Sequence, residues 1–238
     1  WVPLIVVAAL VAWFGMHVLA EARGSFAEQA TIVTRSHTWL MCWLYAGSFG
    51  SFIGFAAAFP LLLGAEAIHA VWLGPLLGAL TRPLGGWLSD RYGGARVTLW
   101  AFVGMMLGSL ALMGALARAT PMQALMTIGF VLFAAAGIGN GSIFRMIPVI
   151  FTRLRVARAE PAEHERAQRE ANKEAAAALG FASAVGAYGG FFIPKSVGTS
   201  IALTGEPNAA LAVFTVFYLS CIAITWWFYH RRFAPVPC

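Results

Sequence analysis

Residues 67–88 read AIHAVWLGPLLGALTRPLGGWL, an apolar run long enough to cross a lipid bilayer as a helix. The run carries one formal charge, Arg82, and an arginine guanidinium keeps its charge inside proteins. At the depth of the hydrocarbon such a charge costs between roughly 3 and more than 10 kcal/mol, so it must face a protein interior or a wet cavity. This stretch therefore predicts a membrane-spanning helix that carries a polar site.

The composition of the whole chain points to the same class. Hydrophobic residues make up 60% of the chain and charged residues 11%, and the mean hydropathy is +0.74. These values are typical of an all-α polytopic membrane protein. Each apolar segment is apolar on all sides and contains scattered glycines, which favours packed helices over the alternating strands of a β-barrel. Hydropathy predicts seven spanning segments: 1–19, 38–62, 67–88, 97–118, 122–150, 173–203 and 208–230.

The basic residues predict the topology. Twelve of the 16 Lys and Arg residues lie in four connections, at 21–37, 89–98, 152–173 and the C-terminal tail. The alternate connections are almost free of them, which is the positive-inside pattern. We therefore expect a multi-pass protein of the cell inner membrane, with membrane lipids around it, a cytoplasmic C-terminus and residue 1 outside. This distribution argues against a nucleic-acid partner, although the net charge is +6.

The chain opens on Trp1, without an initiator Met or signal peptide, and the first helix begins at once. We therefore expect a fragment of a longer transporter. Residues 1–37 are predicted to hold the last helix of an N-terminal bundle and a cytoplasmic interdomain linker. Residues 38–238 are predicted to form a C-terminal six-helix bundle with a cytoplasmic tail.

Arg82 also indicates what the protein binds. No acidic residue lies near it on its own predicted helix, so its negative partner can be the cargo. The first hypothesis is therefore a small anion. Arg145 and Lys195 also lie inside predicted segments, and we expect both to reach the lipid headgroups from near helix ends.

A few polar and aromatic residues could complete an anion site. Tyr45 and Phe49 are four residues apart on one helix face, so they can present an aromatic wall and a hydroxyl donor. Asn140 lies between two glycines and could donate from its amide. Ser183 follows Gly180 by one turn. The alternatives are ordinary core packing for the two rings and a backbone hydrogen bond for the serine.

Nothing in the sequence predicts a cofactor, a metal ion or an enzyme. The three cysteines have no metal-ligand or disulfide spacing, and the five histidines lie at segment ends or in loops. No Ser/His/Asp constellation lies at membrane depth. A rival class is a seven-helix receptor or retinal protein, and for the latter Lys195 is the only candidate lysine.

Residues 86–96, GWLSDRYGGAR, resemble the G-x-x-x-D-R-x-G-x-x-R signature of the major facilitator superfamily. In this loop Gly93 allows a tight turn and Asp90 can cap a helix N-terminus. Arg91 and Arg96 can bridge to neighbouring helix ends. The resemblance implies a conformational gate made of Gly86, Asp90, Arg91, Gly93 and Arg96.

Four further stretches narrow the resemblance to the nitrate/nitrite porter family of that superfamily. The glycine-rich stretch at 178–198 is similar to the family's second nitrate signature, and the stretches at 43–55, 74–86 and 137–151 are similar to its neighbouring helices. The resemblance implies a major facilitator superfamily-like helix bundle in which this chain supplies helices six to twelve of twelve. The N-terminal six-helix half, with a partner arginine, would be missing from it.

By the same resemblance the family's substrate arginine corresponds to Arg82, its nitrate-contacting tyrosine to Tyr45 and its sandwiching phenylalanine to Phe49. The glycine and serine of the signature correspond to Gly180 and Ser183. The implied function is transport of nitrate and nitrite by alternating access. No Asp, Glu or His lies in mid-helix, which favours nitrate/nitrite exchange over proton-coupled nitrate symport.

Overall fold

A computed structural model of the chain describes residues 2–16, 30–64, 69–118, 120–157 and 159–238. The described residues form helices and no strand. The helices are α1 (Val2–Gly15), α3 (Ser36–Tyr45), α4 (Ser51–Leu63), α5 (Leu73–Tyr92), α6 (Gly94–Ala117), α7 (Met122–Val156), α8 (His164–Ala187), α9 (Gly189–Thr204) and α10 (Asn208–Thr225). Four short helical segments join them: η2 (Thr31–Thr34), η3 (Ala46–Gly50), η5 (Pro161–Glu163) and η6 (Trp226–His230). The predicted all-α architecture is confirmed.

Among the described residues, five helical stretches are long and apolar enough to cross a membrane. They are Ser36–Leu63, Gly94–Ala117, Met122–Val156, His164–Thr204 and Asn208–His230. Helix α5 is 20 residues long but carries Arg82 and the charged residues of the loop signature. Helix α1 is a shorter apolar helix. The chain is therefore a polytopic membrane helix bundle. The predicted segment ends at 17–19 and 67–68 lie outside the described residues.

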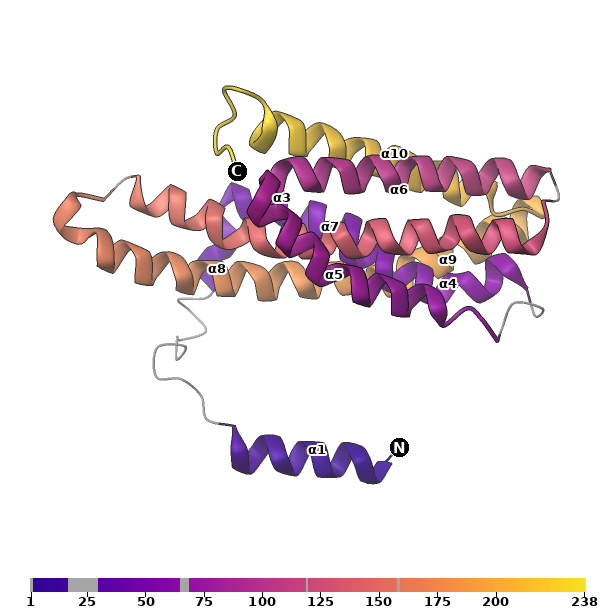
Figure 1. Cartoon of the computed structure of the whole chain (residues 1–238), viewed down its shortest axis with the longest axis horizontal. Helices are drawn as coiled ribbons and strands as arrows, with labels where there is room; N and C mark the ends of the chain where they lie inside the picture. The colour runs from indigo at the N-terminus through magenta and orange to yellow at the C-terminus, as the bar shows by residue number, and fades with distance from the viewer. Residues whose placement is uncertain (1, 17–29, 65–68, 119, 158) are drawn as a thin grey trace.

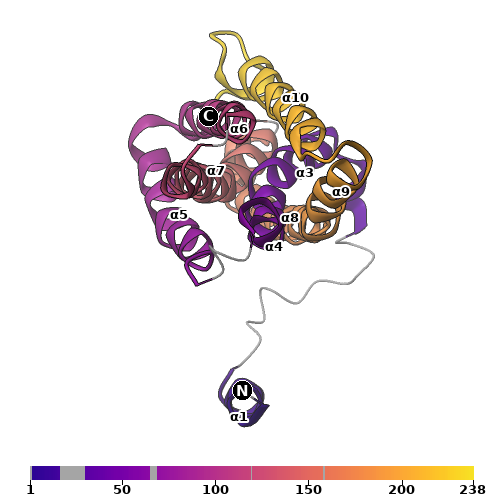
Figure 2. The ribbon, with the colours of Figure 1, turned by 90° about the vertical axis from the view of Figure 1, so that its right-hand side faces the viewer.

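Helices α3 to α10 pack side by side along one long axis (Figure 1), and the end-on view shows them as one bundle (Figure 2). Helix α1 lies apart from this bundle in both views, and none of its residues is buried. The division of the chain near residue 37 stays a prediction.

Helices α5 and α7 pack with their backbones in contact. A Cβ added to Gly137 would lie 2.2 Å from the Gly78 carbonyl oxygen, and one added to Gly85 would lie 2.1 Å from that of Ile138. A Cβ on Gly141 would lie 2.0 Å from the carbonyl oxygen of Arg82. In lipid no hydrophobic force drives one helix onto another, so small residues stabilise the pair by letting the backbones approach. The glycines thus fix Arg82 against the middle of α7.

Two irregularities interrupt the long helical stretches of the bundle. The segment η3 is a single π-helical turn directly after Tyr45, and α8 gives way to α9 at Tyr188. Such π turns change the direction in which side chains point, and they are frequent at functional sites. Here the π turn directly follows Tyr45 and contains Phe49.

A buried hydroxyl cluster joins α5, α6 and α7 at the end of the bundle that carries residues 86–96. Ser142 accepts a hydrogen bond from Ser89 at 2.8 Å, lies 2.8 Å from the Thr98 hydroxyl and donates to the Gly94 carbonyl at 2.9 Å. All three hydroxyl side chains are buried. Because each finds a partner, the cluster stabilises this end of the bundle without an unpaired polar group.

Candidate anion site and gate

Arg82 is half-buried on α5, and its contacts are a hydroxyl and an aromatic ring. Its Nη2 donates to the Tyr45 hydroxyl at 3.4 Å, and its Cζ lies 5.4 Å from the centre of the Phe144 ring. Within the described part of the chain no carboxylate pairs with Arg82. A guanidinium has five N–H donors, so most of its hydrogen-bonding capacity is left for a ligand.

Tyr45 and Phe49 lie together, as their spacing predicts. Their ring centres are 5.1 Å apart at 37°. Tyr45 is 1% exposed and Phe49 is partly buried. Gly186 of α8 packs against both, since a Cβ there would lie 3.2 Å from the Tyr45 ring and 3.1 Å from the Phe49 ring. Gly186 was missed in the sequence as a site residue, and its only signal was its place in the glycine-rich stretch at 178–198.

A cavity of about 370 Å³ opens beside Arg82, between α5 and α7. One water molecule takes roughly 30 Å³ of liquid, so the cavity can hold a small ion together with several waters. Two of the lining side chains, those of Arg82 and Arg145, are positively charged, and no lining residue in the described structure is acidic. The cavity therefore favours an anion. Its walls are Ala79, Arg82, Pro83, Gly86, Gly141, Phe144 and Arg145.

Asn140 lies next to this cavity but does not line it. It precedes Gly141, which touches the backbone of Arg82, and its side chain is 2% exposed. Its Oδ1 has no hydrogen-bond partner among the described residues. A buried acceptor without a partner costs about 1–3 kcal/mol, so a purely structural role for the Asn140 side chain would be unfavourable. Contact between the Asn140 amide and an anion stays a prediction.

Gly180 and Ser183 lie on α8, six and three residues before Gly186. Gly180 is exposed, and no atom lies within 4 Å of a Cβ added there. Ser183 is half-buried and has no hydrogen bond among the described residues. The structure thus places them on the helix that packs against Tyr45 and Phe49, without bringing either into contact with Arg82. Their role in binding stays a prediction.

The gate loop predicted at residues 86–96 consists in the structure of the end of α5, the turn at Gly93 and the start of α6. It contacts α7 through the hydroxyl of Ser142 and through an ion pair. Arg145 Nε donates to Asp90 Oδ1 at 2.5 Å. The expectation that Asp90 caps the next helix was wrong: α6 is capped by Gly93 without a side-chain hydrogen bond. The expectation that Arg145 reaches the headgroups was also wrong, because α7 continues to Val156 and Asp90 lies within reach.

The other gate residues have different surroundings. Gly93 turns the chain with φ at +89°, a conformation that favours glycine. Arg91 lies with its Cζ 5.8 Å from the ring centres of both Trp87 and Tyr92. Arg96 is exposed and makes no ion pair within the described residues, so the predicted bridge from Arg96 to a neighbouring helix end is not formed here.

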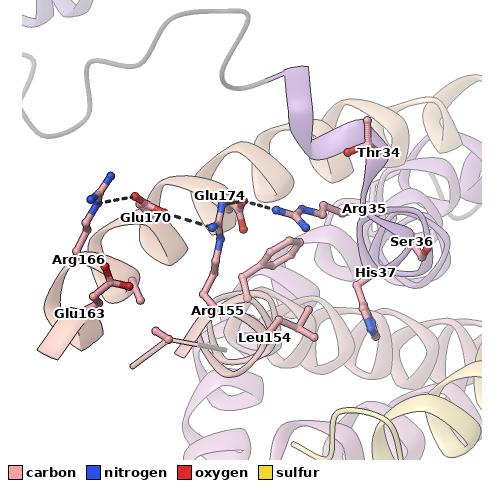
Figure 3. A pocket seen from close by; sticks show the side chains of 13 residues that line it. Thr34, Arg35, Ser36, His37, Leu154, Arg155, Glu163, Arg166, Glu170 and Glu174 are labelled. Carbon is pink, nitrogen blue, oxygen red and sulfur yellow. Dashed lines mark hydrogen bonds and ion pairs between the residues drawn. The ribbon is translucent and has the colours of Figure 1, made fainter. Parts of the chain in front are cut away.

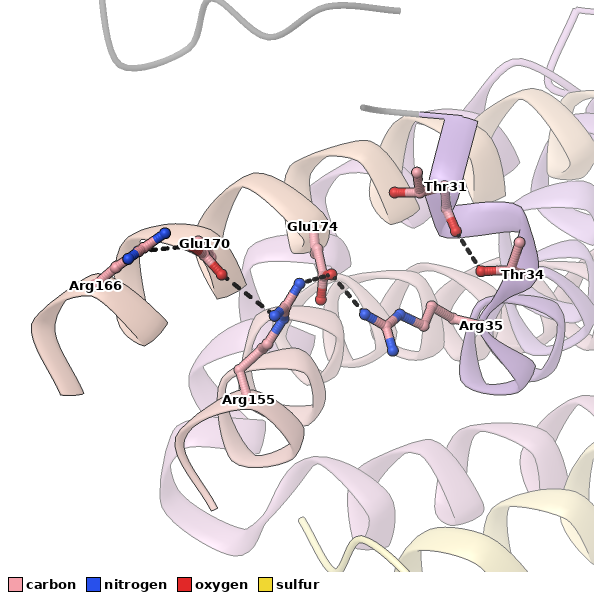
Figure 4. Close-up of polar contacts among 7 residues, drawn as sticks. All are labelled: Thr31, Thr34, Arg35, Arg155, Arg166, Glu170 and Glu174. Atoms are coloured by element: carbon pink, nitrogen blue, oxygen red, sulfur yellow. Dashed lines mark hydrogen bonds and ion pairs between the residues drawn. The ribbon is translucent and has the colours of Figure 1, made fainter. Parts of the chain in front are cut away.

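A second, larger cavity of about 740 Å³ lies where η2 and the start of α3 meet the α7–α8 hairpin (Figure 3). Its charged residues form a chain of ion pairs (Figure 4). Glu174 accepts from Arg35 at 3.1 Å and from Arg155 at 2.5 Å. Glu170 lies 3.2 Å from both Arg155 and Arg166. Among the described lining residues three arginines and three glutamates balance in number, unlike the two arginines of the first cavity, and we assign this cavity a structural role.

Comparison with known proteins gives close relatives. No family model matches the chain. The chain is 45% identical to the nitrate/nitrite transporter NarU of Salmonella typhimurium and 42% identical to NarU of Escherichia coli, each over 98% of its length. It is 33% identical over its whole length to the probable nitrate/nitrite antiporter NarK2 of Thermus thermophilus.

Each of these matches covers 52% of the relative, so the chain spans about half the length of the curated relatives it matches. The identity is high and runs along the whole chain, and the helices fit a polytopic bundle. On these grounds the chain belongs to the nitrate/nitrite porter family of the major facilitator superfamily.

Proposed function

We propose that the full-length protein carries nitrate and nitrite across the membrane by alternating access, and that Arg82 binds the anion from this half. The observation that carries the proposal is an arginine without a carboxylate partner, on a cavity between two membrane helices. Relatives named as nitrate/nitrite transporters and antiporters support the choice of anion.

The chemistry of the site suits a small planar monoanion. A guanidinium can donate two parallel hydrogen bonds to two oxygens of such an ion. Tyr45 accepts from Arg82, and within the described residues nothing accepts the proton of its own hydroxyl, so that proton can be donated to the anion. The rings of Phe49 and Phe144 provide flat walls, which exclude bulkier tetrahedral anions. Asn140, Gly180 and Ser183 complete the proposed site from α7 and α8.

We infer exchange, nitrate for nitrite, as the mode of transport. A site with a fixed positive charge is costly to move when it is empty, whereas a neutralised site reorients more easily. Two candidate proton carriers are already engaged elsewhere: the His37 ring lies 3.0 Å from the Tyr229 hydroxyl, and Glu174 belongs to the ion-pair chain. Proton-coupled symport is the nearest alternative.

The proposal includes the place of the chain in the whole protein. Residues 38–238 would be the C-terminal six-helix bundle, and residues 1–37 the last helix of the N-terminal bundle with its linker. The Arg-rich connections would face the cytoplasm at the inner membrane, together with the C-terminus. The protein would act as a transporter and not as an enzyme or receptor. Lys195, the candidate retinal lysine, is exposed on α9 and lines neither of the two cavities.

Reconstitution tests the proposal. The full-length protein in liposomes loaded with nitrite should take up external nitrate, and Arg82→Lys should lose most of that uptake although the charge is kept. Losing one charge-assisted hydrogen bond costs about 1.5–3 kcal/mol, or roughly tenfold or more in affinity. Arg118→Gln is the control: it removes a positive charge just after the end of α6 that lies away from residues 86–96, and it should transport normally. Uptake by Arg82→Lys at the normal rate would return Arg82 to a structural role.

A further inference from the structure

Arg145 shares the cavity of Arg82 and has a partner that an anion could replace. Both guanidiniums line the same space of about 370 Å³. Gly141 touches the carbonyl of Arg82, and Arg145 follows Gly141 by four residues on α7, about 6 Å farther along the helix axis. The two charges therefore lie in sequence along one cavity, from the middle of the bundle toward the end with the gate loop.

The pair between Arg145 and Asp90 is accessible to the cavity and its solvent. The Arg145 side chain is 57% exposed and that of Asp90 is 54% exposed. Exposed ion pairs contribute little to stability, because water and salt screen them. An anion that enters the cavity can therefore compete with Asp90 for the same guanidinium.

We propose that Arg145 is a second anion-binding residue, which nitrate or nitrite occupies on its way between Arg82 and the gate-loop side in competition with Asp90. This inference rests on the proposed function of Arg82. Asp90 lies in the last turn of α5, three residues before the turn at Gly93. An anion on Arg145 frees Asp90, and the gate loop then loses its ion pair to α7. Passage of the anion and loss of this ion pair become one event, while Ser142 still ties Ser89 and Gly94 to α7.

The ion-pair alternative makes the opposite prediction about two single variants. If the two residues serve only as a pair that holds the loop, Asp90→Asn and Arg145→Gln break the same contact and change transport in the same direction. If Arg145 binds the anion, the two variants differ in sign. Asp90→Asn removes the competitor, so the anion binds more tightly, and Arg145→Gln removes the donor, so the anion binds less tightly.

The experiment measures nitrate/nitrite exchange by the full-length protein in liposomes, with the anion concentration varied separately on each side. We expect Arg145→Gln to raise the half-saturating nitrite concentration on the gate-loop side about tenfold, as for a lost charge-assisted hydrogen bond. The value for nitrate on the opposite side should stay unchanged. Asp90→Asn should lower the gate-loop-side value severalfold, and Arg118→Gln is the control for loss of one positive charge.

A third variant keeps the test decisive where Arg145→Gln does not fold. Arg145→Lys retains the charge for Asp90 but loses the planar fork, so we expect a smaller rise on the same side only. Parallel losses in Asp90→Asn and Arg145→Gln, with full rescue by the charge swap Asp90→Arg/Arg145→Asp, would overturn the inference. In that case a defective Arg82→Lys variant leaves the proposed function standing. A wild-type protein without nitrate exchange would overturn both.

Discussion

At the scale of single residues, the cost of an unpaired charge makes Arg82 the most informative position in the chain. The lone charge of Arg82 and the four-residue spacing of Tyr45 and Phe49 are local patterns that the sequence shows by itself. Only the resemblance to the porter family assigned the three residues to one site. Gly186 and the partner of Asp90 could not be found in this way. Both depend on which helices become neighbours, and a single sequence does not encode that in any local spacing.

Phe49 tests whether the aromatic pair is a wall of the site or a part of the core. Phe49→Ala opens space beside Tyr45, so we expect larger anions such as perchlorate to compete with nitrate more strongly than they do in the wild type. The measurement is inhibition of nitrate exchange by a series of anions of increasing size. Phe55→Ala is the control, since Phe55 packs against Phe214 at 5.9 Å between ring centres, whereas Phe49 packs against Tyr45. Neither phenylalanine lines the cavity beside Arg82. Equal selectivity in the two variants would assign Phe49 to the core.

At the scale of the elements, hydropathy predicted the helices well, because length and composition alone decide whether a segment can span a membrane. The predicted segments at 38–62, 97–118 and 208–230 coincide closely with helical stretches of the structure. The π turn at η3 and the change from α8 to α9 at Tyr188 were not predicted. They depend on the packing of neighbouring helices, which the hydropathy profile does not contain.

The contact between α5 and α7 gives a prediction about stability. In Gly141→Ala the new methyl group would lie 2.0 Å from the Arg82 carbonyl oxygen, so the two helices must move apart. We expect a loss of about 1–3 kcal/mol, typical of overpacking, and a weaker anion site because Arg82 moves with its helix. Gly198→Ala is the control, since a Cβ there meets no atom within 4 Å. Thermal unfolding in detergent should show a lower midpoint for Gly141→Ala and no loss for Gly198→Ala.

The ion-pair chain around Glu174 gives a second prediction at this scale. The Glu174 side chain is 16% exposed and binds both Arg35, which precedes α3, and Arg155, near the end of α7. Glu174→Gln leaves two guanidiniums facing each other, so we expect a loss of about 1–3 kcal/mol, between the values for exposed and buried pairs. Glu165→Gln, whose side chain is 92% exposed and 3.9 Å from Arg169, should unfold like the wild type. Equal unfolding midpoints for the two variants would mean that the chain of ion pairs does not hold η2 and α3 against α8.

At the scale of the whole molecule, the two cavities differ in their place along the bundle and in the balance of their charges. The cavity at Arg82 carries unbalanced positive charge, and the cavity at Glu174 is lined by alternating charges that pair with one another. The sequence predicted the positive site, because that charge lies in an apolar segment. For the second region it predicted only a connection rich in basic residues, because the partner Arg35 lies 139 residues from Glu174 along the chain.

The coupling of transport follows from this distribution of charge. In the described residues the cavity at Arg82 is lined by two arginines and by no carboxylate or imidazole, so the lining offers no such side chain as a proton carrier. In the proposed exchange an anion compensates the positive site in each reorientation, and this requires an anion in both directions. We therefore expect nitrate uptake into liposomes to require internal nitrite or nitrate, and to be nearly insensitive to a pH gradient. The decisive comparison is between liposomes loaded with nitrite and liposomes loaded with an impermeant buffer, each with and without an inward proton gradient. If the proton gradient drives uptake into the buffer-loaded liposomes, that result would contradict exchange and favour proton-coupled symport. Uptake confined to the nitrite-loaded liposomes would leave the arginine-lined cavity as the physical reason for the coupling.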